Sequence, residues 1–166
     1  MAEPEARRTE VEEWLAASVL FRRLAEEDRA RLAQLAELRS YRRGRTVFRE
    51  GDPSRHFFTV VSGRVKVFTL GGRGEHLPLA ELGPGDFFGE VSLLTGKPRT
   101  ATITAGTKVS AIELDRAAVD EIAQEHPEVL TTLDDFCRQR AHQAVEAVIR
   151  RLRRKGGPTT ARETEP

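Results

Sequence analysis

The residues best suited to bind a ligand lie between Phe88 and Ala101, in the run F-G-E-V-S-L-L-T-G-K-P-R-T-A. Gly89 precedes a segment, 90–94, that we expect to form one short helical turn, whose free N–H groups and dipole attract anions. A glycine lets the backbone approach a ligand closely, because it has no Cβ. Arg99 adds a planar guanidinium that can hold two phosphate oxygens at once. Together these features predict a site for a phosphodiester.

An acidic residue, Glu90, directly follows the glycine, where it would repel a phosphate. Its position is explained if the carboxylate accepts a hydrogen bond from a sugar hydroxyl, because an ionised carboxylate only accepts. One acid for a ribose 2′-OH, one arginine for a phosphate and one helical turn together fit a cyclic nucleotide. In the competing interpretation, the apolar residues of the run belong to the core and Arg99 is a surface charge. A purely structural turn, however, does not need Glu90, Pro98, Arg99 and Thr100 together in one ordered motif, so this interpretation is disfavoured.

The run 88–101 resembles the phosphate-binding cassette of cyclic-nucleotide-binding domains, which occur in the bacterial catabolite activator protein, in regulatory subunits of cyclic-AMP-dependent kinase and in cyclic-nucleotide-gated channels. The resemblance extends over roughly residues 20–155 and includes the strings G-R-T-V-F-R-E-G-D and F-x-V-x-S-G-x-V-x-V, which resemble the first half of the family's barrel. It implies that cAMP or cGMP is the ligand. The ligand-binding residues that it implies are Phe88, Gly89, Glu90, Val91, Ser92, Arg99, Thr100 and Ala101.

The resemblance also implies that a long C-terminal helix is a lid over the base. In bacterial cyclic-AMP activators the lid carries hydroxyl residues, but the corresponding residues 143–145 here have none. The possible lid positions are therefore Arg140, Gln143 and Ala144, with His142 as a further alternative for contact with the base. Thr100 follows the cassette arginine, as in cyclic-GMP-responsive members and also in bacterial cyclic-AMP sensors. The choice between cAMP and cGMP stays open.

Composition limits the class of protein. The chain has 166 residues and a net charge of +1, which predicts one domain with appendages and no bulk attraction to nucleic acid or membrane. It contains no apolar run near the roughly 18 residues of a membrane span, and the polar, acidic segment 1–5 does not resemble a secretory signal. The single cysteine, Cys137, excludes an internal disulfide. We expect a cytoplasmic protein.

The spacing of apolar residues predicts the order of the elements. A flexible or helical extension, 1–18, comes before residues 19–24, which introduce a helix over 26–38. From about 40 to 114, short apolar runs alternate with glycine turns, which is typical of a barrel or jelly roll. Pro78 predicts an edge strand. The predicted fold class is α+β, mainly β; the resemblance implies that it is a cyclic-nucleotide-binding jelly roll with N-terminal helices and a long C-terminal helix.

Jelly rolls also include metal-binding cupins, so an enzyme must be considered. A cupin site needs paired histidines on one strand with a carboxylate and a third histidine nearby. The histidines here are widely separated, at positions 56, 76, 126 and 142, and spacing indicates no serine–histidine or cysteine–histidine pair. We therefore expect no enzyme, no metal site and no cofactor apart from the nucleotide ligand.

The C-terminal part returns to a helical pattern. Asp115 is a predicted N-cap for a helix over 116–124, and Pro127 starts a second helix that runs to about Arg154. A helix of about 28 residues is about 42 Å long, which exceeds what a barrel of this size covers. Its apolar residues follow a heptad-like spacing of three and four, which favours a homodimer over packing on its own barrel alone. They are Leu130, Leu133, Phe136, Cys137, Ala141, Ala144, Val145, Val148, Ile149 and Leu152.

The last residues lead to an expectation about the whole protein. The basic run 150–155 suits the helix dipole better than a docking patch, and 156–166 is predicted to be a disordered tail. With the domain placed at 19–155, we expect no helix-turn-helix DNA reader. The hypothesis is a stand-alone bacterial cyclic nucleotide sensor that signals to an effector protein through its C-terminal helix. The alternatives are a structural interaction module that binds no nucleotide and a fragment of a longer protein.

Overall fold

The computed structural model describes residues 3–155, without the side chains of Glu3, Leu93, Ala144, Ala147, Val148 and Lys155. The predicted disordered tail, 156–166, lies outside these residues. In chain order the elements are α1 (Glu3–Ala17), α2 (Glu26–Leu35), β1 (Ala36–Tyr41), β2 (Thr46–Phe48), β3 (His56–Ser62), β4 (Val65–Leu70), β5 (His76–Leu82), β6 (Phe87–Phe88), α3 (Glu90–Thr95), β7 (Thr102–Ala105), β8 (Val109–Asp115), α4 (Arg116–Glu125) and α5 (Glu128–Lys155).

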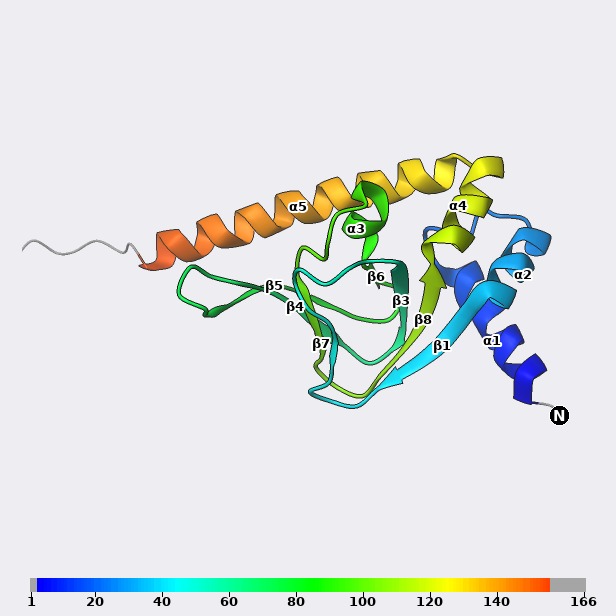
Figure 1. Cartoon of the computed structure of the whole chain (residues 1–166), viewed down its shortest axis with the longest axis horizontal. Helices are drawn as coiled ribbons and strands as arrows, with labels where there is room; N and C mark the ends of the chain where they lie inside the picture. Colours follow the sequence, from blue (N-terminus) through cyan, green and yellow to red (C-terminus); the bar gives the residue numbers. More distant parts are fainter. Residues whose placement is uncertain (1–2, 156–166) are drawn as a thin grey trace, which may run out of the picture.

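The strands form two antiparallel four-stranded sheets, in the orders β1-β8-β3-β6 and β2-β7-β4-β5. Helices α1, α2 and α4 gather at one end of the barrel, and α5 runs across it above α3 (Figure 1). The predicted jelly-roll class is therefore confirmed. Pro78 lies on β5, which pairs with β4 and occupies the edge of its sheet, as predicted from the missing proline N–H.

One predicted element is wrong in part. The helix expected over 26–38 ends at Leu35, and the next six residues form β1. This strand pairs with β8 along its whole length, from Ala36 opposite Leu114 to Tyr41 opposite Val109. The hydrogen bonds between β1 and β8 satisfy the backbone groups that a longer helix would otherwise satisfy locally. Because β8 lies beside these residues, the strand forms in place of the last turns of the helix. Residues 19–24, expected to introduce that helix, form turns.

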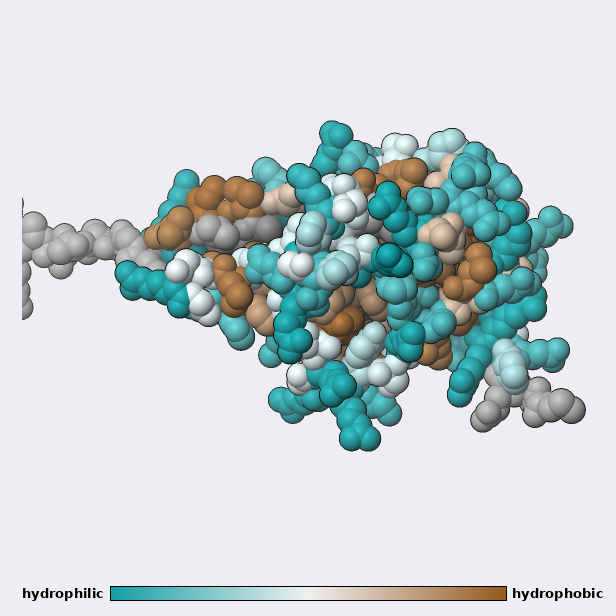
Figure 2. Space-filling model, viewed as in Figure 1, coloured by the Kyte–Doolittle hydropathy of each residue, from teal (hydrophilic) through white to brown (hydrophobic). Residues whose placement is uncertain are grey.

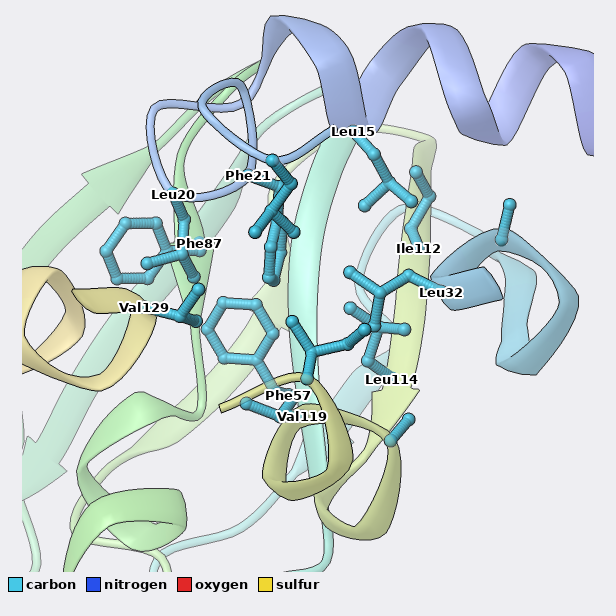
Figure 3. Close-up of a cluster of buried hydrophobic side chains, with 14 of the residues drawn as sticks. Leu15, Leu20, Phe21, Leu32, Phe57, Phe87, Ile112, Leu114, Val119 and Val129 are labelled. Carbon is cyan, nitrogen blue, oxygen red and sulfur yellow. The ribbon is translucent and has the colours of Figure 1, made fainter. Parts of the chain in front are cut away.

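A helical layer covers one face of the first sheet, and a buried apolar cluster joins the two (Figure 3). Phe57 of β3 meets the ring of Phe21 edge-on, with centroids 6.4 Å apart, and lies tilted against Phe87 at 5.5 Å. Val11 and Leu15 bury the first helix, α1, in the same cluster. A second cluster fills the space inside the barrel; its members are Phe58, Val60, Val65, Leu82, Phe88, Ile103, Ala105, Val109 and Ala111.

The C-terminal helices form as predicted. Asp115 caps α4, because its side chain accepts a hydrogen bond from the Ala117 N–H at 2.9 Å. The long helix α5 has 28 residues, and its first turns are anchored by Val129 and the fully buried Leu133. Burial of one such leucine contributes about 1.5–3 kcal/mol. These contacts fix the near half of α5 to the helical layer.

The far half of α5 exposes large apolar side chains to solvent. Val145, Ile149 and Leu152 are 57%, 43% and 66% exposed. They recur at spacings of four and three and so share one side of the helix. Apolar side chains gather near the C-terminal end of α5 on the face shown in Figure 2. Within 3–155, none of the helices combines the length and apolar character that a membrane span needs.

Candidate ligand-binding site

Gly89 is the N-cap of α3, and the short helix predicted over 90–94 is present at Glu90–Thr95. The glycine has a φ of 86°, in the left-handed region that favours glycine. A Cβ at this position would lie 2.7 Å from Nη1 of Arg99 and 3.0 Å from the carbonyl oxygen of His56. The site therefore needs glycine both for its backbone angle and for the close approach of the arginine.

Backbone hydrogen bonds fix where Arg99 enters the site. Its N–H donates to the Asp52 carbonyl at 2.9 Å, and its own carbonyl accepts from the Gly51 N–H at 2.8 Å. The hydroxyl of Ser92 on α3 donates to the carbonyl of Pro98, the preceding residue, at 3.4 Å. The turn after β2 and the short helix together hold the segment that carries the guanidinium.

The Arg99 side chain is 5% exposed and bonds to carbonyl groups. Nη2 donates to the His56 oxygen at 2.8 Å and Nη1 to the Gly89 oxygen at 3.3 Å. The guanidinium carbon lies 3.9 Å from the centroid of the Phe48 ring, which is a cation–π arrangement. Nε is buried and has no partner among the described residues.

The charge of Arg99 is therefore poorly compensated. Burial lowers the pKa of its guanidinium to about 10, against the opposing effect of the nearby Glu90 carboxylate. The group still carries its proton at neutral pH. A buried cation that bonds only to neutral carbonyl groups, and whose Nε has no partner among the described residues, is costly unless an anion reaches it. Arg99 is therefore the candidate group for binding an anion in this pocket.

Glu90 is 5% exposed and pairs with a residue fifty positions away. Its Oε1 accepts from Nη1 of Arg140 on α5 at 2.7 Å, and the Arg140 guanidinium lies 4.5 Å from the centroid of the Phe87 ring. The predicted ribose acceptor and one predicted lid residue are thus in direct contact. Sequence reasoning proposed both residues but missed their pairing, since nothing local indicates it.

A pocket of about 650 Å³ lies between the barrel, α3 and α5. This volume is within the range of about 300–1,000 Å³ that small-molecule sites occupy. All eight residues predicted to bind ligand line it, as do Arg140 and Gln143; the side chain of Ala144 is outside the description. His142 is not among the lining residues, and its ring pairs with Glu146 at 3.3 Å. The apolar walls that the prediction missed include Phe48, Val67, Leu79, Ile103 and Phe136.

The model of the cyclic nucleotide-binding domain family matches residues 38–126, which is more than half of the chain. This chain belongs to that family. The domain is 31% identical over 144 residues to a CRP-like cAMP-activated global transcriptional regulator of Mycobacterium tuberculosis, covering 87% of this chain and 59% of the relative. It is 36% identical over 108 residues to a cAMP-dependent protein kinase regulatory subunit of Dictyostelium discoideum, covering 63% of this chain and 33% of the relative.

A solved structure has the same fold as this cyclic nucleotide-binding domain. The N-terminal domain of a transcriptional regulator from Streptomyces coelicolor superposes with a TM-score of 0.61 at 34% identity, covering 86% of this chain and 92% of that one. The relatives from Mycobacterium and Dictyostelium are named as regulators or regulatory subunits. The chain spans less than two thirds of the length of either.

One further polar group lies in the wall of the domain's pocket. The thiol of Cys137, on α5, is half-buried. Burial, together with the charge of Glu90, raises its pKa to about 12. A thiol with so high a pKa is neutral and weakly nucleophilic at physiological pH. We therefore assign it to the packing of the wall.

Proposed function

We propose that this domain is a sensor whose ligand is cAMP or cGMP and whose response is carried by α5. The observation that supports this most strongly is the buried, incompletely bonded guanidinium of Arg99 in a pocket beside Gly89 and the start of α3. A cyclic phosphate carries one negative charge and would supply the anion that Arg99 lacks. The N–H groups of Glu90, Val91 and Ser92 would bind the same phosphate.

Glu90 would accept a hydrogen bond from the ribose 2′-OH. Its ion pair with Arg140 uses Oε1, and a carboxylate has about four acceptor positions on its two oxygens. Ribose and arginine can therefore bind the same carboxylate together. The ribose would then contact α3 directly and α5 through the carboxylate that it shares with Arg140.

The base would lie between apolar walls from the strands and the underside of α5. Val67, Leu79 and Ile103 offer flat apolar contact, while Thr100 and Gln143 are neutral polar groups in the lining. The relatives from Mycobacterium and Dictyostelium are named for cAMP, which makes cAMP the first ligand to test and cGMP its competitor. A ligand moves α5 only if it binds one position of the helix more tightly than another.

Thermal unfolding with each nucleotide tests the proposal. At about 100 times its dissociation constant, a ligand adds roughly 2.7 kcal/mol to the free energy of unfolding. For a domain of this size the midpoint should rise by about 5–10 °C. The control ligand is 5′-AMP, which has the same base and ribose as cAMP but no cyclic phosphate. If protein that is shown to be free of ligand does not respond to either cyclic nucleotide, the interaction-module hypothesis replaces the sensor.

The exposed far half of α5 supports a second proposal, that two copies pair through this helix. The stripe of Val145, Ile149 and Leu152 lies about 140° around the helix from Arg140, at 100° per residue. Pairing would therefore cover the stripe and leave the pocket side free. A short apolar seam of this kind is typical of two-stranded coiled coils.

Light scattering at increasing protein concentration should give the mass of a dimer. The double variant Ile149→Lys/Leu152→Lys should give the mass of a monomer, because it places two charges in the seam. The matched control is Gln34→Lys/Gln124→Lys, which adds the same charge at exposed positions of α2 and α4. A parent protein that stays monomeric at all concentrations contradicts the proposal.

A further inference from the structure

His126 occupies the corner between α4 and α5. Its N–H donates to the Ile122 carbonyl at 2.9 Å and ends α4, and its carbonyl accepts from the Val129 N–H at 3.1 Å as α5 begins. The backbone direction changes here, with a φ of −130° and a ψ of 73°. The orientation of α5 relative to the rest of the domain therefore depends on what holds this residue.

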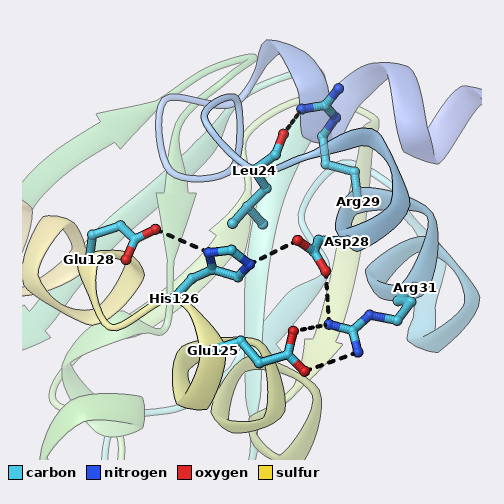
Figure 4. A network of polar contacts seen from close by, with 7 residues as sticks. All are labelled: Leu24, Asp28, Arg29, Arg31, Glu125, His126 and Glu128. Carbon is cyan, nitrogen blue, oxygen red and sulfur yellow. Dashed lines mark hydrogen bonds and ion pairs between the residues drawn. The ribbon is translucent and has the colours of Figure 1, made fainter.

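The imidazole of His126 lies between two carboxylates (Figure 4). Nε2 is 2.8 Å from Oδ2 of Asp28 on α2, and Nδ1 is 3.2 Å from Oε1 of Glu128, the first residue of α5. Ionised carboxylates only accept hydrogen bonds, and a neutral imidazole has one N–H. Only the protonated ring can donate to both at once. The geometry is that of an imidazolium which joins α2 to the start of α5.

The surrounding charges fix this arrangement. Nη2 of Arg31 lies 2.8 Å from the other oxygen of Asp28 and 2.8 Å from Oε2 of Glu125, at the end of α4. Asp28 and the ring of His126 are shielded, with side chains 16% and 28% exposed. Asp28, Glu125 and His126 are also close enough together to suggest a metal site. The guanidinium of Arg31 already bridges the two carboxylates, so we assign no metal here.

The contacts of the pair shift the pKa of both groups. The hydrogen bond to Asp28 is the main reason that the pKa of His126 is raised above its ordinary value, with Glu128 adding to it. Burial alone would raise the pKa of Asp28, but the hydrogen bonds from His126 and Arg31 lower it. Each partner favours the charged form of the other.

We propose that His126 is a positioning residue for α5 and that its protonation clamps the corner between α4 and α5 to α2. When the ring loses its proton it can donate to only one of Asp28 and Glu128, and the corner loosens. Because α5 carries Phe136 and Arg140 to the pocket, the clamp would also hold the wall of the nucleotide site in place. This last step rests on the proposed function.

The sign of the effect follows from linkage. The folded pKa of His126 lies above the unfolded value of about 6.5, so its stabilisation is fully present below about pH 6.5. It is lost as the pH rises through the folded value. Affinity for cAMP should fall over the same interval, because the clamped corner and the pocket-lining position of α5 belong to one conformation.

The clamp itself is tested without nucleotide, by the urea midpoints of the parent and His126→Gln at about pH 6 and pH 8.5. The parent should have the higher midpoint at the lower pH, and the difference should disappear at the higher pH. The control is His142→Gln, which removes an exposed histidine of α5. An equal difference between parent and His126→Gln at both pH values overturns the clamp.

Calorimetric titration with cAMP then measures its effect on the site. The parent and His142→Gln should lose about fivefold or more in affinity between these two pH values, while His126→Gln should be unchanged. If His126→Gln fails to fold, Glu128→Gln serves instead. This variant removes one of the two carboxylates beside the ring, so the ring has to donate only to Asp28. NMR should then show a lower pKa for His126 than in the parent. Equal pH dependence in all variants refutes the coupling to the site. A working clamp in a protein that binds no cyclic nucleotide refutes only the proposed function.

Discussion

Arg99→Ala should lower the affinity for cAMP by roughly 100-fold or more. The variant loses two charge-assisted hydrogen bonds to the phosphate, at about 1.5–3 kcal/mol each, and a factor of ten corresponds to about 1.4 kcal/mol. It also removes one of the two arginines that line the pocket, and the other, Arg140, is already paired with Glu90. Isothermal titration calorimetry at neutral pH measures the change directly.

Two further variants separate charge from geometry. Arg99→Lys keeps the cation but loses the planar fork, so its affinity should lie between those of the parent and the alanine variant. Arg138→Ala removes a 79%-exposed arginine of α5 and should bind as the parent does. Removing a buried, weakly paired cation should leave the urea midpoint of Arg99→Ala near or above that of the parent. Unchanged binding by Arg99→Ala would mean that the phosphate lies elsewhere.

Gly89→Ala should weaken both the fold and the site. At a φ of 86° an alanine costs about 1 kcal/mol in backbone strain. Its Cβ would also meet Nη1 of Arg99 at 2.7 Å and the backbone oxygen of His56 at 3.0 Å. We expect the free energy of unfolding to fall by roughly 2 kcal/mol and affinity for cAMP to fall more than tenfold, because the guanidinium must move. Urea unfolding and calorimetry measure the two effects.

Gly44→Ala is the matched control for this prediction. Its φ is 84°, almost the same, but a Cβ there has no atom within 4 Å. It should therefore show the backbone strain alone, about 1 kcal/mol, with unchanged affinity for cAMP. The difference between the two variants isolates the contact with Arg99. Equal losses of stability, with full binding by both, would show that this close approach has no part in the site.

Features fixed within a few residues were predictable from sequence. Three helix starts are of this kind: α3 after Gly89, α4 after Asp115 and α5 after Pro127. Each is determined by the residue that precedes the helix and its nearest neighbours in the chain. The extent of α5 followed from an uninterrupted apolar spacing without a helix-breaking residue. The cassette is of the same kind, since one ordered run supplies both Glu90 and Arg99.

β1 could not be predicted in this way. Leu32, Leu35 and Leu38 follow a spacing that a helix explains well, and the chain changes to a strand in the middle of it. The reason lies far along the sequence, where β8 offers a complete ladder and Glu113 pairs with Arg39 across the two strands at 2.8 Å. Tertiary pairing overrides a local preference of this size.

In the site, too, local features were predictable and long-range contacts were not. Arg99 bonds to the carbonyl of His56 on β3, and Glu90 pairs with Arg140 on α5. Both contacts depend on how β3 and α5 pack against the segment 88–101. Arg140 entered the prediction only through the resemblance, as a lid position. The network around His126 gave no sequence signal, because its members on α2 and on α5 are about one hundred residues apart.

The length of α5 gives the domain a mechanical property. The helix extends about 42 Å from the corner at His126, and Arg140 lies about 18 Å along it. A rotation of about 10° around that corner would shift Arg140 by about 3 Å and the far end by about 7 Å, if α5 moves as a rigid rod. As a rigid rod, the helix would act as a lever arm that more than doubles, at its far end, a displacement of Arg140 at the pocket.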